Sequence, residues 1–166
     1  MKLNTDGSSL ENLGTAGSGG VFRDEDSNWV LGYSRHIVIT SSFIAELWPM
    51  RDGLSLCINR NFLAVDIELD AKAIIDVLTN PNQTNSVIST IMDDCRQLAS
   101  QIPQVRFSHC FKEANRCADG LIRMGTQQSL DFILYDSPPM ASGIFADFDH
   151  SGLYHNRCCP EMIVNL

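Results

Sequence analysis

The sequence predicts an α/β or α+β domain in which helices pack on a β-sheet. Three observations support this prediction. The first forty residues alternate apolar and polar side chains with the period of two that is typical of strands. Apolar residues then recur at helical spacing through the middle of the chain. Two further strand-like segments, 62–70 and 105–111, lie between the helices.

The chain has 166 residues, which is enough for one domain with its own core. Hydrophobic residues make up 44% and charged residues 19%, as in ordinary globular proteins. We expect residues 1–135 to form this single domain. The segment 136–166 contains prolines and glycines with little periodicity, so we expect an irregular C-terminal tail.

The first elements in chain order are three predicted strands. Residues 2–7 alternate as a strand, and the glycine-rich segment 13–20 is typical of a bend. Residues 20–37 then contain two apolar runs joined by the polar "DEDSN" at 24–28, which predicts an antiparallel hairpin. The chain therefore begins with three neighbouring strands.

The later elements alternate between helices and strands. Segment 41–59 has apolar residues at helical spacing after a serine cap, and 62–70 returns to period two. The remaining predicted elements are helices at 71–80, 84–102 and 115–125 and a strand at 105–111. The expected order is strand-strand-strand-helix-strand-helix-helix-strand-helix.

Charge and hydropathy exclude several classes of protein. The net charge is −8, and the 12 Lys and Arg residues form no run, so a basic patch alone cannot provide tight nucleic-acid binding. A metal ion, a partner domain or another protein would have to supply affinity. No apolar run approaches the roughly 18 residues of a membrane helix, and the signal-peptide pattern is missing. We expect a monomer in the nucleus or cytoplasm, without membrane contact.

The six cysteines form no Cys-x-x-Cys pair and are expected mostly as small buried hydrophobic residues. One local group, His150, His155, Cys158 and Cys159, matches none of the usual zinc spacings. We therefore expect no structural zinc there.

Four acidic residues stand at positions where the chain changes element. Asp6 is expected to end the first strand, beside Gly7, and Asp70 ends the strand at 62–70. If these strands are neighbours, both carboxylates emerge at the same edge of the sheet. Glu46 and Asp119 lie in the first turns of two predicted helices. Taken singly, each acid also fits a structural role as a turn residue, a helix cap or a partner of the helix dipole.

Taken together, the acids suit a metal centre. Mg²⁺ prefers carboxylate oxygens, and two such ions about 3.5–4 Å apart can clamp the oxygens of a phosphoryl displacement. That chemistry requires several acids from different elements to converge at one point.

Five ordered motifs resemble one known family. The segments "LNTDGSS", "GTAGSGGVFRDEDSNWVLGYS", "SSFIAELWPMRDGL", "DIELDAKAIIDVL" and "FKEANRCADGLIRMG" are similar to the plant RNase H-like domain that occurs alone or at the end of retroelement reverse transcriptases. The similarity runs from Lys2 to Gly125. It implies the ribonuclease H fold, a mixed five-stranded sheet whose first three strands are antiparallel, with helices on its faces.

The resemblance also implies a function and a site. The family's metal-binding acids fall on Asp6, Glu46, Asp70 and Asp119. These would hold two Mg²⁺ or Mn²⁺ ions in an endonuclease that hydrolyses the RNA strand of RNA–DNA hybrids. The expected RNA contacts are Asn115 and the backbone near Gly7 and Ser8.

Departures from the family pattern favour other readings. Pro49, three residues after Glu46, is expected to kink the helix or to delay its regular part to about Trp48, and so to displace Glu46. His109 lies in a strand pattern and is expected to be structural rather than catalytic. The family's basic hybrid-binding helix is missing. The alternatives are therefore a catalytically weak or inactive RNase H-fold binding module, and an exonuclease on the same fold.

Overall fold

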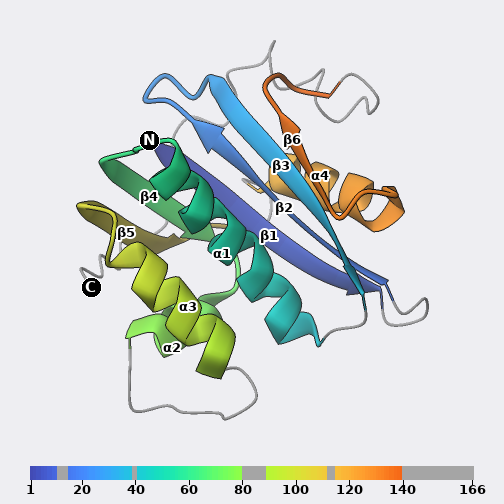
Figure 1. The fold of residues 1–166 in the computed structure, drawn as a ribbon, viewed down its shortest axis with the longest axis horizontal. Helices are drawn as coiled ribbons and strands as arrows, with labels where there is room; N and C mark the ends of the chain where they lie inside the picture. Colours follow the sequence, from blue (N-terminus) through green and yellow to red (C-terminus); the bar gives the residue numbers. More distant parts are fainter. Residues whose placement is uncertain (11–14, 39–40, 80–88, 112–114, 140–166) are drawn as a thin grey trace.

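The computed structural model describes residues 1–10, 15–38, 41–79, 89–111 and 115–139. These residues form a mixed sheet of order β5-β4-β1-β2-β3-β6 with helices on its faces (Figure 1). The strands are β1 (Lys2–Leu10), β2 (Thr15–Arg23), β3 (Trp29–Val38), β4 (Ala64–Leu69), β5 (Gln104–His109) and β6 (Phe132–Tyr135). The helices are α1 (Ser42–Asn59), α2 (Lys72–Thr79), α3 (Ser89–Ala99) and α4 (Arg116–Gln127). None of these helices is long and apolar enough to cross a bilayer.

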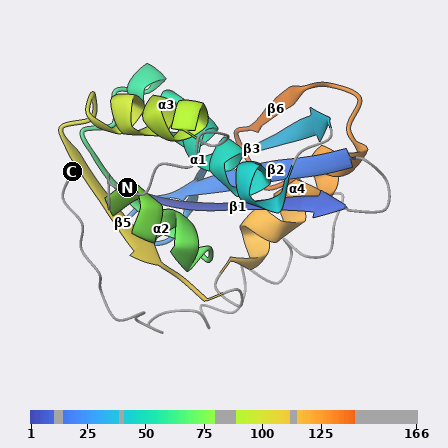
Figure 2. The ribbon, with the colours of Figure 1, turned by 90° about the horizontal axis from the view of Figure 1, so that it is seen from below.

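Two kinds of strand pairing make up the sheet. β1, β2 and β3 pair antiparallel, as expected, whereas β4 pairs parallel with β1 and with β5. Figure 2 shows α1 and α3 on one side of the sheet and α4 on the other. The predicted mixed α/β architecture is confirmed.

The glycine-rich segment forms a strand rather than the expected bend. Gly17 and Gly19 lie within β2, and α4 packs directly on them. A methyl group on Gly17 would lie 2.5 Å from the carbonyl oxygen of Ile122 in α4. Glycine is therefore present here because a helix backbone approaches the strand closely, and not because the chain turns.

The predicted hairpin between β2 and β3 is confirmed. Its connection is closed by Asp24, whose side chain accepts hydrogen bonds from the backbone N–H groups of Asp26 (3.0 Å) and Asn28 (2.8 Å). The Asn28 side-chain amide, which donates to Asp24 at 2.9 Å, and these backbone bonds lower the pKa of Asp24 below its ordinary value, since they favour the charged form.

A sixth strand was not expected. β6 adds antiparallel to β3, so the sheet has one strand more than the predicted five. Its four residues, "FILY", are all apolar, and so short a run without alternation gives no periodic signal. The boundary predicted after residue 135 coincides with the end of β6, but the division into domain and tail stays a prediction. Residues 140–166, including His150, His155, Cys158 and Cys159, lie outside the described residues.

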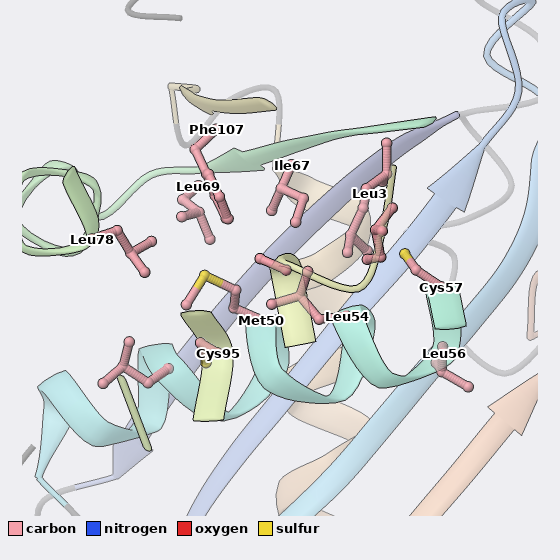
Figure 3. Packing of buried hydrophobic residues seen from close by; sticks show 14 of the residues in the cluster. Leu3, Met50, Leu54, Leu56, Cys57, Ile67, Leu69, Leu78, Cys95 and Phe107 are labelled. Atoms are coloured by element: carbon pink, nitrogen blue, oxygen red, sulfur yellow. The ribbon is translucent and has the colours of Figure 1, made fainter. Parts of the chain in front are cut away.

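The main core lies between the sheet and the helices α1, α2 and α3 (Figure 3). Leu47, Met50, Leu54 and Cys57 of α1 are fully buried, at the three- and four-residue spacing of one helix face. They meet alternate residues of the strands, such as Leu3 and Ile67. The other labelled members of the core are Leu56, Leu69, Leu78, Cys95 and Phe107.

The four described cysteines are expected to be unreactive in the folded protein. Cys57, Cys95, Cys110 and Cys117 are buried thiols, and burial raises the pKa of the first two to about 12. Because the thiolate is the reactive form, an aromatic disulfide reagent at about pH 8 should modify none of them quickly. A Cys158→Ser/Cys159→Ser variant leaves only these four thiols to count. Fast labelling of that variant without denaturant would contradict the prediction, whereas denaturation should release all four.

Candidate metal centre

Three carboxylates from three elements converge beside the end of the β1–β4 pairing. Asp6 belongs to β1, Glu46 to the second turn of α1, and Asp70 directly follows β4. One carboxylate oxygen of each lies within 4.8 Å of the other two, and all three residues are half-buried. Within the described part of the chain, no other group of this kind is present.

Parallel pairing brings Asp6 and Asp70 together. The β1–β4 register ends at Thr5 opposite Leu69, so the two acids directly follow the last pair. The expectation that these strands are neighbours is confirmed. The expectation that Asp6 ends its strand is wrong, because β1 continues to Leu10 and Asp6 pairs with Gly19 of β2.

A close crossing of α1 over β1 positions Glu46. The Gly7 N–H donates a hydrogen bond of 3.2 Å to the Glu46 carboxylate. A methyl group on Gly7 would lie 2.0 Å from the Ala45 carbonyl oxygen, so only glycine permits this approach. Gly7 therefore determines how closely α1, and with it Glu46, approaches β1.

Pro49 lies inside α1, and the kink or displacement of Glu46 expected from it stays a prediction. α1 is one helix from Ser42 to Asn59 with Pro49 inside it, so the expected start near Trp48 is wrong. A proline lacks the N–H that would bond to the carbonyl four residues earlier, here that of Ala45. That carbonyl packs against Gly7, and Glu46 lies within the acid cluster.

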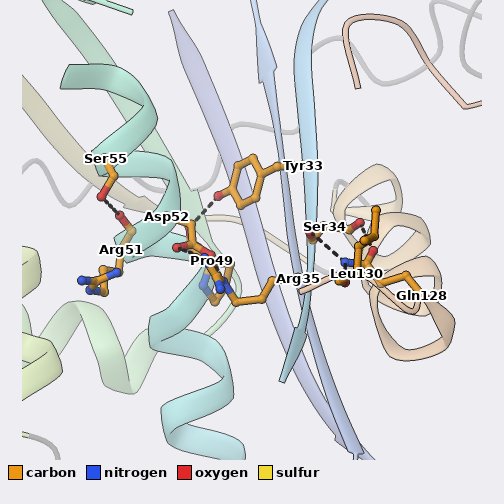
Figure 4. A network of polar contacts seen from close by, with 9 residues as sticks. All are labelled: Tyr33, Ser34, Arg35, Pro49, Arg51, Asp52, Ser55, Gln128 and Leu130. Carbon is orange, nitrogen blue, oxygen red and sulfur yellow. Dashed lines mark hydrogen bonds and ion pairs between the residues drawn. The ribbon is translucent and has the colours of Figure 1, made fainter. Parts of the chain in front are cut away.

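A buried polar network attaches α1 to β3 (Figure 4). Arg35 of β3 donates to both carboxylate oxygens of Asp52 in α1, at 2.5 and 3.0 Å. The Tyr33 hydroxyl donates to the Pro49 carbonyl at 2.5 Å. Burial raises the pKa of Asp52 above its ordinary value although Arg35 opposes the shift, and burial raises the pKa of Tyr33 well above its own.

The fourth predicted ligand, Asp119, stands outside the three-acid group. It lies in the first turn of α4 and forms an ion pair of 3.0 Å with Arg123, one turn further on. Both side chains are largely exposed, so this pair is worth at most about 1 kcal/mol. Its role as a ligand stays a prediction.

The three predicted RNA contacts differ in exposure. Ser8 is half-buried, Gly7 is buried beneath α1, and Asn115 is only 1% exposed. The Asn115 amide donates to the Thr5 carbonyl at 2.9 Å. Their contacts with RNA stay predictions.

His109 has a contact next to the cluster that the strand pattern did not indicate. Its Nε2 lies 3.1 Å from the backbone carbonyl of Asp70, and its ring packs edge-on against Phe111. An alternating pattern places His109 in a strand, but it carries no information on which carbonyl the imidazole meets.

The donor set fits a divalent metal ion. Three carboxylates this close repel one another unless a cation lies between them, and oxygen ligands of this kind are those that Mg²⁺ and Mn²⁺ prefer. Asp6, Glu46 and Asp70 would hold such an ion, and each is partly open to solvent. The number of ions and their identity are part of the proposal below.

Comparison with known sequences shows the family of this chain. A family model described as reverse transcriptase-like matches residues 4–125. The Arabidopsis thaliana protein named "Putative ribonuclease H protein" is 35% identical over 141 residues, which is 85% of this chain and 23% of that protein. The chain thus spans less than a quarter of this relative's length.

Solved structures share the fold. Ribonuclease H1 of the halophilic archaeon Halobacterium salinarum superposes with a TM-score of 0.71 at 21% identity, over 76% of this chain and 96% of that one. LC11 ribonuclease H1, isolated from compost and solved with an RNA/DNA hybrid, gives 0.69 at 23% identity over 76% and 96%. The chain belongs to the reverse transcriptase-like family, and its described residues form an RNase H-like domain.

Proposed function

We propose that this protein is a metal-dependent endonuclease that hydrolyses the RNA strand of RNA–DNA hybrids. The convergence of Asp6, Glu46 and Asp70 within 4.8 Å carries the proposal. The name of the Arabidopsis relative and the hybrid bound to LC11 ribonuclease H1 support the choice of substrate.

The residues of the chain have separate tasks in this proposal. When bound, two Mg²⁺ or Mn²⁺ ions would activate a water and neutralise charge on the phosphodiester. Asp6 and Asp70 are held by the paired strands, and Gly7 orients Glu46 through its N–H. Asp119 would be a fourth ligand from α4, where one of its carboxylate oxygens is paired with Arg123.

Substrate recognition rests on shape more than on charge. The net charge of −8 opposes phosphate binding, so binding of the hybrid by this domain alone is weak. Contacts of Ser8 and of the backbone near Gly7 with the RNA, and a partner domain that adds affinity, belong to the proposal. The 2′-hydroxyl distinguishes the RNA strand from DNA.

The test is cleavage of an internally labelled RNA–DNA hybrid at low salt with Mg²⁺ or Mn²⁺. The parent should cut at internal positions, and Asp6→Asn and Asp70→Asn should each lower the rate by at least about 100-fold. Asp26→Asn, in the exposed β2–β3 connection, is the matched control and should cut normally.

Other outcomes would decide for the alternatives. Hybrid binding by the folded parent without cleavage, and without any effect of metal, would establish a binding module. Products released only from strand ends would indicate an exonuclease. Equal activity of the parent and Asp70→Asn would place the chemistry elsewhere.

A further inference from the structure

Asn115 stands at the N-cap of α4 but does not cap the helix. An asparagine at this position usually accepts a hydrogen bond from an N–H of the first turn. Here its side chain makes no capping bond. Its Nδ2 instead donates to the Thr5 carbonyl of β1 at 2.9 Å, and the residue is 1% exposed.

The contact falls at the point where the sheet opens. Thr5 and Leu69 form the last pair of the parallel β1–β4 register, and Asp6 and Asp70 follow them. Strand β1 therefore meets α4 through Asn115 one residue before Asp6. The Thr5 carbonyl belongs to the residue directly before Asp6.

The same residue also holds the backbone of Asp119. The Asp119 N–H donates to the Asn115 carbonyl at 3.1 Å. Asn115 is thus bonded through its side chain to the strand of Asp6 and through its main chain to the turn that carries Asp119. The main-chain bond is one that any residue would make here, so the side-chain bond to Thr5 is the contact that depends on asparagine.

Two buried polar atoms beside this contact have no hydrogen-bond partner in the described part of the chain. Among the described residues, Asn115 Oδ1 and Thr5 Oγ1 are buried without a hydrogen-bond partner. A leucine or valine at position 115 would leave no such orphaned amide oxygen. The amide is therefore present for its donor group, which the Thr5 carbonyl uses.

We propose that Asn115 is a positioning residue that sets the place of Asp119 relative to Asp6, Glu46 and Asp70, rather than a residue that contacts RNA. This inference rests on the proposed function. Because Asn115 is buried, it acts through Asp119 and the Thr5 carbonyl and not through the substrate. Loss of the Asn115 donor loosens the attachment of α4 to β1. The affinity for the metal ion that has Asp119 as a ligand then falls.

The test is Asn115→Asp, which keeps the size of the side chain but places a carboxylate oxygen against the Thr5 carbonyl. Mn²⁺ binding to the protein without nucleic acid is measured by titration calorimetry, and hybrid cleavage is measured beside it. The weaker Mn²⁺ site should lose about 10- to 100-fold in affinity, as is typical when a group that orients a ligand is removed. The kcat should fall by a similar factor, with KM for the hybrid unchanged within about twofold.

Two further variants separate positioning from general destabilisation. Met92→Ala, on the buried face of α3, removes stability in a helix that carries none of the four acids and should leave the Mn²⁺ affinity unchanged. Asn115→Ser retains a shorter donor and should lose less Mn²⁺ affinity than Asn115→Asp. It replaces Asn115→Asp in the test if that variant does not fold.

Each contrary result has a distinct meaning. A raised KM with unchanged Mn²⁺ affinity would make Asn115 an RNA contact and overturn the inference. Equal Mn²⁺ losses in Asn115→Asp and Met92→Ala would reduce its role to folding stability, which also overturns it. If the parent binds Mn²⁺ and cuts while Asn115→Asp behaves identically, only this inference fails. If the parent neither binds Mn²⁺ nor cuts, the proposed function itself fails.

Discussion

Gly7→Ala is expected to destabilise the domain by at least about 3 kcal/mol, the upper part of the range for overpacked cores. The new methyl group would lie 2.0 Å from the Ala45 carbonyl oxygen and 2.4 Å from its carbonyl carbon. Both are backbone atoms, so no side-chain rotation can relieve the clash. Helix α1 must move away from β1, which also breaks the 3.2 Å bond from Gly7 to Glu46. Urea unfolding followed by circular dichroism measures the loss.

Ser8→Ala is the matched control for this change. Ser8 is the next residue of the same strand, and its side chain points to the opposite face. Its unfolding midpoint should stay close to that of the parent. A Gly7→Ala protein as stable as the parent would show that α1 does not cross β1 at the described depth.

Arg35→Met is expected to cost about 3 kcal/mol near neutral pH, because it leaves the buried Asp52 carboxylate without its cation. Methionine keeps an unbranched apolar side chain but also removes the contacts of the Arg35 guanidinium with the rings of Trp48 and Phe132. The loss should be seen as a lower urea midpoint with an unchanged slope.

The pH dependence of that loss follows from Asp52. Burial already raises the pKa of Asp52 in the folded protein above the ordinary 3.8, and removal of Arg35 raises this pKa further. The folded state then binds the proton more tightly than the unfolded state, so the contribution of Asp52 to stability is lost as the pH rises through its raised pKa. The deficit of Arg35→Met relative to the parent should therefore shrink as the pH falls toward 3.8.

An Arg35→Met/Asp52→Leu double variant supplies the control. It removes the uncompensated charge and should recover most of the stability and lose the added pH dependence. A deficit in Arg35→Met that does not change between neutral and acidic pH would show that Asp52 is not its source.

The parts of the fold that could be predicted are those with a local periodic cause. Alternation along residues 62–70 located β4, and helical spacing located α1, because each pattern reflects one buried face. The glycine-rich part of β2 was predicted as a bend because its glycines make room for α4. That helix is distant in the sequence, so no local pattern indicates the contact. β6 was missed because it is too short for a pattern.

The candidate site was predictable in its membership more than in its contacts. Strand neighbours and motif resemblance together indicated that Asp6, Glu46 and Asp70 meet. The pairing of Asp119 with Arg123 depends on side-chain rotamers. The pairing of Arg35 with Asp52 depends on which strand α1 crosses. The Arg35–Asp52 pair leaves no mark in the linear spacing of charges, whereas Asp119 and Arg123 have the four-residue spacing that brings two charges together on a helix.

The parallel pairing of β1 with β4 also determines when, during synthesis, the site can form. The antiparallel strands β1, β2 and β3 are consecutive and can pair as soon as they leave the ribosome. β1 is then paired with β2, whereas β4 has not yet been synthesised. The pairing of Thr5 with Leu69 forms only after that. The carboxylates meet only after α1 has crossed the sheet and β4 has closed a long loop. A cation held by these carboxylates would therefore bind only after β1 has paired with both β2 and β4.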